Sequence, residues 1–181
     1  MWDLPRRAGD RERLYAEAAE TFGAALGRLA RAYERDADRR RDLLQEIHIA
    51  LWRSLSRFDG RCSLRTWVYR VAHNTAISKT IRRRANAPPT LAIDDHAEWI
   101  DTAGSAEEAI DRRRALDRLH LLIRQLRPLD RQIMLLYLEQ LDAASIAEIT
   151  GLSAANVATR VHRIKHLLME RFQGKGHGQQ R

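Results

Sequence analysis

Residues 142–171 place the strongest constraint on the fold, because they have the form of a short helix, a turn and a longer helix. Apolar residues recur every three or four positions in the longer segment and form one stripe: Val157, Val161, Ile164 and Leu168. Ser153 is placed to cap this helix, and Gly151 marks the turn after residues 143–150. The pattern predicts a helix-turn-helix, whose second helix can lie in a DNA major groove.

The side of this predicted helix away from the stripe is polar and basic. It carries Asn156, Thr159, Arg160, Arg163, Lys165 and His166. No acidic residue occurs between Gly151 and Met169, so the helix presents a positive field to a polyanion. A helical hairpin that only packs is the alternative, and the charge favours DNA binding over it.

The formal net charge of +8 is unevenly distributed along the 181 residues. Residues 1–84 hold 19 basic and 11 acidic side chains, residues 85–106 hold 0 and 4, and residues 107–181 hold 13 and 9. Two basic blocks separated by an acidic strip favour a nucleic-acid partner, although a solvated basic surface has the same composition.

Cys62 is the only cysteine, which excludes a disulfide or a cysteine metal cluster within one chain and fits a reducing compartment. The longest apolar run, residues 133–138, is too short to span a bilayer, and the first residues are charged rather than signal-like. We therefore expect a cytoplasmic protein without membrane insertion.

Three helices are predicted in the first half of the chain, at residues 11–33, 37–55 and 64–84, with Asp36 and Ser63 as caps of the second and third. The third helix is predicted to turn inward a stripe of Leu64, Trp67, Val68, Val71 and Thr75. Its predicted outward face consists of Thr66, Tyr69, Arg70, His73, Ile77, Thr80 and Arg84. Such a face can contact bases and phosphates, and an ordinary amphipathic surface helix is the alternative.

The second half begins after residues 85–106, an acidic linker in which Pro88 and Pro89 exclude a continuing helix. Residues 105–108 have the Ser-x-x-Glu form of a capping box for a helix to about residue 125. A helix at residues 130–140 is apolar on nearly every side, which predicts the core of this half. The prediction is an all-α chain of two small helical domains, residues 1–84 and 107–173, joined by a flexible acidic linker and followed by a disordered tail, residues 174–181.

With these motifs in order, the chain resembles bacterial RNA polymerase sigma factors of the extracytoplasmic-function (ECF) group over nearly its whole length. Residues 42–47 (DLLQEI) and 50–52 (ALW) resemble the region 2 helix that binds the clamp coiled coil of the largest polymerase subunit. Residues 58–63 (FDGRCS) and 64–74 (LRTWVYRVAHN) resemble the loop and helix that read and open the minus-10 promoter element. Residues 126–131 (LRPLDR) and the helix-turn-helix resemble region 4, which binds the minus-35 element and the flap of the second-largest subunit.

The resemblance implies a promoter-specificity subunit that catalyses nothing itself and holds no cofactor or metal. Its implied partners are core RNA polymerase, promoter DNA and an anti-sigma factor. The residues implied in core polymerase binding are Asp42, Gln45, Glu46, Leu51 and Trp52. Those implied at minus-10 DNA are Phe58, Arg61, Ser63, Asn74, Lys79, Arg82 and Arg83, and those at minus-35 DNA are Asn156, Thr159, Arg160 and Arg163.

Two positions depart from the family pattern. Relatives often carry Arg or Lys where this chain has Ala158, and an aromatic or aliphatic residue where it has His48. Ala158 removes a base or phosphate contact common in the family, and His48 is either a packing histidine or part of a variant polymerase contact.

A helix-turn-helix regulator that acts without polymerase is the alternative function, but it would leave residues 42–52 and 58–74 unexplained. His162 and His166 have the spacing of metal ligands, yet no carboxylate is expected beside them on that face. Two domains on a flexible tether are also expected to bind promoter DNA poorly until polymerase fixes their spacing, because ordering them costs entropy.

Overall fold

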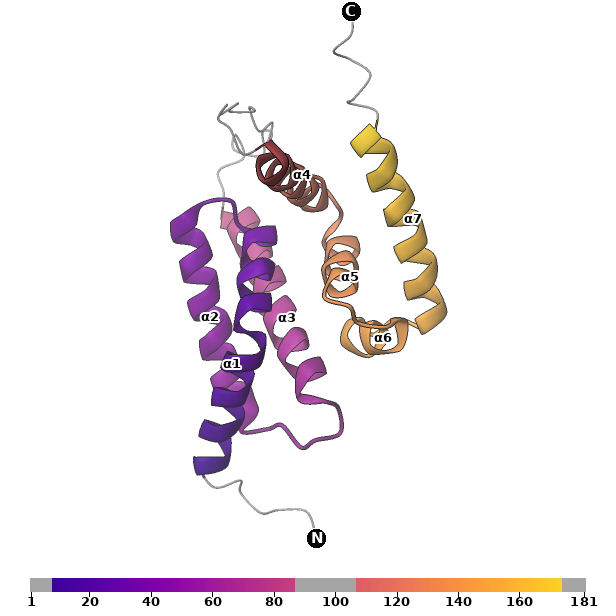
Figure 1. Ribbon diagram of the computed structural model, residues 1–181. Coiled ribbons are helices and arrows are strands. Elements are labelled where there is room, and N and C mark those ends of the chain that lie inside the picture. Colours follow the sequence, from indigo (N-terminus) through magenta and orange to yellow (C-terminus); the bar gives the residue numbers. More distant parts are fainter. Residues whose placement is uncertain (1–7, 87–106, 174–181) are drawn as a thin grey trace, which may run out of the picture.

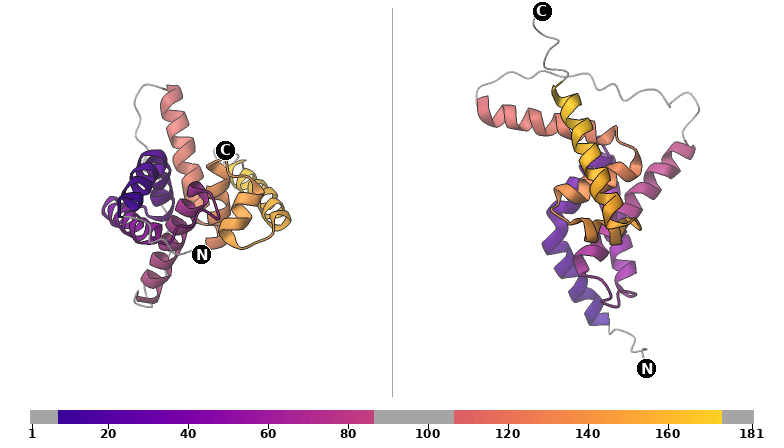
Figure 2. Two further views of the ribbon diagram at one scale, coloured as in Figure 1. Left: turned by 90° about the horizontal axis from the view of Figure 1, so that it is seen from below. Right: turned by 90° about the vertical axis from the view of Figure 1, so that its right-hand side faces the viewer.

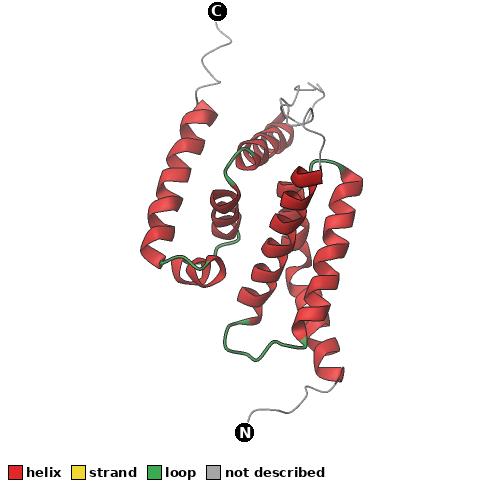
Figure 3. Cartoon of the chain, turned by 180° about the vertical axis from the view of Figure 1, so that it is seen from behind, coloured by secondary structure: helices red, strands yellow, loops and turns green. Residues whose placement is uncertain are grey.

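The computed structural model describes residues 8–86 and 107–173, and every regular element within these ranges is an α-helix (Figure 1, Figure 3). The first range forms α1 (Ala8–Tyr33), α2 (Ala37–Leu55) and α3 (Leu64–Asn86). The second forms α4 (Glu107–Arg124), α5 (Pro128–Leu138), α6 (Ala143–Thr150) and α7 (Ala154–Gln173). The predicted all-α fold is confirmed. Most of the predicted linker, the tail and the capping box at Ser105 lie outside the described residues.

Polar side chains cap four of the helices, three of them at the predicted positions Asp36, Ser63 and Ser153, and the fourth at Asp142, which was not predicted. Each of four caps accepts a hydrogen bond from a backbone N–H three residues on: Asp36 from Arg39 at 2.9 Å, Ser63 from Thr66 at 3.0 Å, Asp142 from Ser145 at 2.7 Å and Ser153 from Asn156 at 3.3 Å. Gly151 ends α6 in the left-handed conformation, with φ of 77°, which glycine adopts without strain. The predicted helix-turn-helix is therefore present as α6, a tight turn and α7.

The first bundle packs α1, α2 and α3 against one another, and here the predicted faces of α3 were partly wrong. Thr66, Tyr69 and His73 were expected to face outward but are buried, with 4%, 3% and 1% of their surface exposed. Most of the expected inward stripe is only half-buried, and Val68 alone of that stripe is fully covered. The reason is that α3 is contacted by α1 and α2 on one side and by α5 and α6 on another.

The second bundle packs α4, α5 and α6 around α7. The whole predicted stripe of α7 is buried: Val157, Val161, Ile164 and Leu168 are 0–9% exposed. In α5, Ile133 and Leu136 are fully covered, whereas Tyr137 and Leu138 at its end are 38% and 44% exposed. The predicted role of α5 as the core of this half is thus confirmed for its first two turns.

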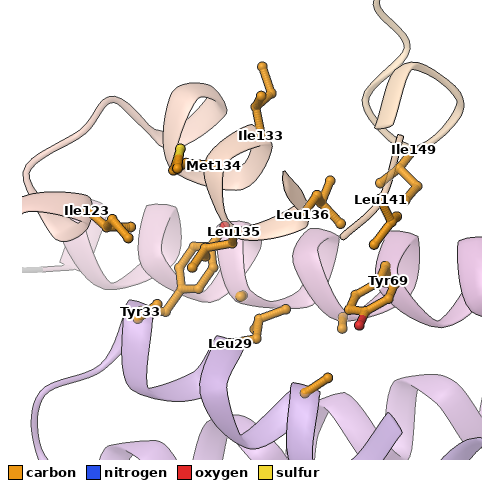
Figure 4. Close-up of a cluster of buried hydrophobic side chains, with 14 of the residues drawn as sticks. Leu29, Tyr33, Tyr69, Ile123, Ile133, Met134, Leu135, Leu136, Leu141 and Ile149 are labelled. Atoms are coloured by element: carbon orange, nitrogen blue, oxygen red, sulfur yellow. The ribbon is translucent and has the colours of Figure 1, made fainter. Parts of the chain in front are cut away.

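The two bundles are packed onto each other, because their buried side chains form one continuous cluster (Figure 4). In Figure 4, Tyr33 of α1 lies next to Leu135 of α5, and Tyr69 of α3 lies next to Leu141. Helices α5 and α6 each contact both α3 and α7, and they lie between them in Figure 1 and in the view from below (Figure 2, left). This position explains why α5 is apolar nearly all round: it meets its own bundle on one side and the first bundle on the other.

Candidate polymerase and nucleic-acid interfaces

The outer face of α7 holds the four predicted minus-35 residues, three of them in one hydrogen-bonded network. Arg160 donates through Nε to Oδ1 of Asn156 at 2.9 Å and through Nη1 to Oδ1 of Asp130 at 2.8 Å. Arg163 donates through Nη2 to Asp130 at 3.2 Å and 3.4 Å. Thr159 is exposed, and its hydroxyl donates to the carbonyl of Ala155. Asp130 itself, at the start of α5, was not among the predicted residues.

In the loop before α3, residues 58–63, the side chain of Phe58 is buried and that of Arg61 is exposed. Phe58 is only 8% exposed and packs against Trp67 with ring centroids 5.4 Å apart, so it supports the loop from beneath. Gly60 has φ of 79°, a conformation that a side chain would strain. Arg61 projects outward with 90% of its side chain exposed and pairs with Asp59 at 2.9 Å. Ser63 serves as the cap of α3.

A shallow groove of about 500 Å³ runs between α2 and α3 and brings together two of the predicted residue sets. Its lining consists of Glu46, Ile49, Ala50, Arg53, Asn74, Thr75, Ser78 and Arg82. Glu46 comes from the predicted polymerase set, whereas Asn74 and Arg82 come from the predicted minus-10 set. Lys79 links the two helices through an ion pair with Glu46 at 2.9 Å. The two surfaces are therefore adjacent.

Two neighbouring arginines at the end of α3 have different surroundings. Arg83 donates through Nη1 to both carboxylate oxygens of Glu34, at 2.9 and 2.6 Å, and Glu34 is only 4% exposed. Arg82 is exposed, and its hydrogen bond runs to the carbonyl of Ser78 in its own helix at 3.3 Å. Arg83 therefore neutralises a buried carboxylate, which limits its freedom to contact DNA, whereas Arg82 is available.

All five residues of the predicted polymerase set lie on α2, and all but one of them reach the surface. Asp42 and Gln45 are exposed and Glu46 is half-buried, but Leu51 is 1% exposed and belongs to the core of the bundle. Its side chain can support a partner surface and cannot form one. Trp52 is half-buried, with the guanidinium of Arg11 4.1 Å from its ring centroid.

His48 has a packing role in this structure. Its Nδ1 lies 3.0 Å from the hydroxyl of Tyr15, and the two rings meet edge to face. Tyr15 also meets Trp52 edge to face, with ring centroids 5.4 Å apart. The departure from the family pattern at His48 is thus accommodated by a partner on α1.

Glu139, just after α5, joins the two bundles, and sequence reasoning missed it. Its carboxylate accepts hydrogen bonds from Nε and Nη2 of Arg28 at 2.6 and 2.7 Å and from the hydroxyl of Tyr69 at 3.4 Å. Arg65 donates to its backbone carbonyl. The paired carboxylate raises the pKa of Arg28, and burial raises the pKa of Tyr69 to about 12. We call this set of contacts the Glu139 clasp.

A second polar contact crosses the same boundary. Arg70 of α3 donates to the backbone carbonyl of Glu148 in α6 at 2.8 Å and lies 3.8 Å from its carboxylate. Deeper in the interior, His73 is within 3.2 Å of the Tyr33 hydroxyl, and burial lowers the pKa of His73 to about 3. The Arg131 guanidinium of α5 lies 5.4 Å from the Tyr33 ring centroid. Helix α3 therefore meets the second bundle through Arg70, and α1 meets it through the ring of Tyr33.

One expectation about α7 needs correction. Glu170 lies 3.4 Å from His166, so a carboxylate does stand on the face that carries His162 and His166. Within the described ranges, however, no group of three or more histidine, cysteine or acidic side chains is arranged to hold a metal ion. No helix in the same ranges is both long and apolar enough to cross a membrane.

Comparison with known proteins agrees with the division into two helical units. The family model for Sigma-70 region 2 matches residues 19–86, and that for Sigma-70 region 4 matches residues 116–168. RNA polymerase sigma-H factor of Pseudomonas aeruginosa is 27% identical over 155 residues, covering 82% of this chain and 80% of the relative. ECF RNA polymerase sigma-E factor of Haemophilus influenzae is 29% identical over 143 residues, covering 73% and 74%. The chain belongs to the RNA polymerase sigma factors of the ECF type, and its function lies in transcription initiation.

Two solved structures share the fold over most of the chain. CnrH in complex with the cytosolic domain of CnrY superposes with a TM-score of 0.65 at 21% identity, covering 90% of both chains. The sigma factor RpoE in complex with the anti-sigma factor NepR, from Bartonella quintana, superposes with a TM-score of 0.68 at 18% identity, covering 88% of this chain and 96% of that one. The coverage includes both helical bundles.

Proposed function

We propose that the first bundle binds core RNA polymerase through α2 and contacts the minus-10 element through residues 58–63 and α3, while α7 reads the minus-35 element. The observation that carries this proposal is the presence, on one chain, of two helices whose exposed faces combine cations with hydrogen-bonding side chains. Asn74 and Arg82 line the groove on α3, and Arg163 projects from α7. We further propose that the protein acts in the cytoplasm and that an anti-sigma protein can bind it, as NepR binds RpoE.

The observed arrangement cannot contact both promoter elements at once. Elements centred at minus 10 and minus 35 are about 25 base pairs apart, or about 85 Å along the DNA at 3.4 Å per base pair. A compact chain of 181 residues has a radius of gyration of about 16 Å and a width of about 40 Å. The longest helix, α1, has 26 residues and is about 39 Å long. Reading both elements therefore requires the bundles to separate.

The chain has the length needed for that separation. Twenty residues connect Asn86 to Glu107, and an extended segment of this length spans at most about 70 Å. With the dimensions of the two bundles added, this reach covers the distance between the promoter elements. We propose that the described arrangement is a closed, free state, and that polymerase binding supplies the free energy to open it.

Opening would break the apolar contact between the bundles and the Glu139 clasp. It would also release Arg65 and Arg70 of α3 from acceptors in the second bundle. This gives a physical reason for weak promoter binding by the free chain that differs from tether entropy: the cost is the lost interface, about 25 cal/mol for each Å² of apolar surface exposed.

Run-off transcription with purified core polymerase tests the proposed function. The full chain should bind core polymerase in a pull-down and should direct transcripts from a subset of a promoter library. A regulator acting without polymerase would instead bind DNA tightly by itself and would not associate with the enzyme. Tight, specific DNA binding by the free chain with no polymerase association would overturn the proposal.

Energy transfer between two dyes tests the opening. Glu17 on α1 and Met169 on α7 are exposed, so each can be replaced by cysteine in a Cys62→Ser background. The free chain should give efficient transfer, and core polymerase should reduce it strongly. Unchanged transfer in an active holoenzyme would contradict the proposed separation of the bundles.

A further inference from the structure

Asp130 is a buried carboxylate at the point where α5 meets the outer face of α7. It lies in the first turn of α5, and only 8% of its surface is exposed. Burial of a charge is costly unless the charge is paired, and Asp130 is paired twice, with Arg160 and with Arg163. One carboxylate thus organises two of the cations that α7 directs outward.

The two arginines are held in different ways. Arg160 is bound at two points, through Nε to Asn156 and through Nη1 to Asp130, and its side chain is 30% exposed. Arg163 is bound to Asp130 through Nη2, and its side chain is 64% exposed. Among the described residues, no hydrogen bond is formed by Nε or Nη1 of Arg163. The side chain of Arg160 is therefore held in place at two points, whereas Arg163 keeps N–H donors that can bind another molecule.

We infer that Asp130 is a positioning residue that determines the base preference of α7. It holds one edge of the Arg163 guanidinium, so that the other N–H donors of this side chain point into the DNA major groove. The inference rests on the proposed role of α7 at the minus-35 element. A guanidinium has five N–H donors, and Asp130 holds Arg163 through Nη2 alone. The edge formed by Nη1 and the second N–H of Nη2 is then left for paired donation to O6 and N7 of a guanine. Through Arg160, the same carboxylate also orients Asn156.

The inference predicts two opposite effects when the charge of Asp130 is removed. Without its anchor, Arg163 populates more rotamers, so the preferred base loses its advantage over the other bases. At the same time the negative charge beside Arg160 and Arg163 is removed, so the net charge near the DNA-facing surface rises by one unit and binding to any sequence is maintained or strengthened. A substitution that merely damaged the fold would weaken binding to all sequences together.

The test uses the full chain in holoenzyme and a promoter library randomised across the minus-35 element. Asp130→Asn keeps the side-chain size and removes the charge. A well-placed arginine gives a base preference of about 5- to 150-fold, and Asp130→Asn should reduce this ratio at least about fivefold at one position. Binding to a fragment with a scrambled element should stay equal or increase. An unchanged preference, or an equal loss at every sequence, would overturn the inference.

Matched variants separate this inference from the proposed function. Glu170→Gln makes the same charge change on the exposed far part of α7, where Glu170 pairs with His166, and should leave the preference unchanged. Arg163→Ala should flatten the preference at the same position as Asp130→Asn. If Arg163→Ala has no effect, the proposed role of α7 fails; if it flattens the preference and Asp130→Asn does not, only the role of Asp130 fails.

A second substitution covers the case in which Asp130→Asn does not fold. Asp130→Glu keeps the charge that Arg160 and Arg163 neutralise and moves the carboxylate by one methylene. It should melt close to the parent temperature, keep the parent binding to scrambled DNA and lose part of the base preference. Full parent preference in a folded Asp130→Glu chain, as measured on the same library, would contradict the positioning role.

Discussion

The two helices proposed to contact DNA differ in what holds their cations. On α7, Arg160 and Arg163 are held by Asp130 within the same bundle. On α3, Arg65 and Arg70 donate to backbone carbonyls of the other bundle, at Glu139 and Glu148. The outer face of α7 is therefore arranged before any DNA arrives. On α3, the positions of Arg65 and Arg70 depend on how the two bundles sit, whereas Lys79, Arg82 and Arg83 farther along the helix pair within the first bundle. We call the face of α7 preorganised and the part of α3 that carries Arg65 and Arg70 conditional.

This difference suggests a division of labour. A preorganised face loses little entropy on binding and can discriminate bases in duplex DNA. A face that forms contacts only after a rearrangement can make its activity depend on a partner, because the partner supplies the free energy of opening. In this protein the natural partner for that step is core polymerase, which the proposed contacts place against α2 beside α3.

The largest change in function is expected on the preorganised face of α7, when Arg163 is removed. Arg163→Ala should lower the preference for the best minus-35 base by about 5- to 150-fold, because a well-aligned arginine supplies about 1–3 kcal/mol of discrimination. Run-off transcription across single-base promoter variants measures this ratio. Lys165→Ala is the control: Lys165 is exposed on the same helix and its Nζ lies 3.4 Å from the Tyr137 hydroxyl. Equal base profiles for the two variants would refute the assignment.

The next effect concerns His73, which is buried on α3, and the dependence of protein stability on pH. Burial lowers the folded-state pKa of His73 to about 3, from an unfolded value near 6.5, so the unfolded chain binds the extra proton. The contribution of neutral His73 to stability is complete above about pH 6.5 and is lost as the pH falls toward 3. This loss is about 2 kcal/mol at pH 5 relative to pH 7.5.

Urea unfolding of the parent and of His73→Gln at these two pH values measures that contribution. Glutamine cannot titrate but can still hydrogen-bond the Tyr33 hydroxyl. The variant should lose less stability than the parent between pH 7.5 and pH 5, and the acidic side chains common to both chains cancel in the difference. A variant with the same acid sensitivity as the parent would show that His73 is not the group responsible.

A smaller effect is expected when the contact between the two bundles is weakened at Glu139. Glu139→Gln weakens the clasp to Arg28, whose side chain is 52% exposed, so solvent screening limits the loss to roughly 1 kcal/mol, or about fivefold in the opening equilibrium. Dye energy transfer in the free chain should fall, and polymerase should bind more tightly. Glu20→Gln changes the charge at an exposed site on α1 and is the control. Closed chains in both variants would mean that the clasp contributes nothing.

The smallest effect compares two neighbours on α3. Arg82→Ala should weaken promoter binding a few-fold at all sequences and reduce the slope of log affinity against log salt by about 0.9, the value for one phosphate contact. Arg83→Ala would instead leave the buried carboxylate of Glu34 unpaired and should lower the melting temperature. Holoenzyme binding titrations at several salt concentrations, with thermal melting of each chain, distinguish the two. A salt slope unchanged by Arg82→Ala would remove it from the DNA-facing set.

Local pattern predicted the helices well, because caps and apolar periodicity act within a few residues. Asp36, Ser63 and Ser153 cap helices at the predicted positions, and the apolar stripe of α7 is buried throughout. The faces of α3 were predicted less well. A helix with neighbours on two sides has no single buried stripe, so its periodicity does not tell which polar groups, such as Thr66 and His73, lie inside.

Some site residues could not be found from the sequence. Asp130 belongs to the LRPLDR segment that resembles region 4, but that resemblance gave it no role, and Glu139 looks like an ordinary charged residue after a short helix. The importance of both comes from partners 30 to 111 positions away in the chain. The only sequence signal for the contact between bundles was the helix at residues 130–140, which is apolar on nearly every side. That helix was interpreted only as the core of its own half, although a helix of one small bundle needs only one apolar face, and its remaining apolar surface is covered by the first bundle.

The amino-acid sequence by itself determined the all-helical class, the positions of the helices and turn, and the two basic blocks separated by acidic residues, since each follows from interactions between residues close in the chain. The tertiary structure decided that the two bundles share one interior, that Glu139 and Asp130 collect the arginines, and that α3 faces a bundle rather than solvent. These features depend on burial and charge pairing between distant segments, which local periodicity does not contain.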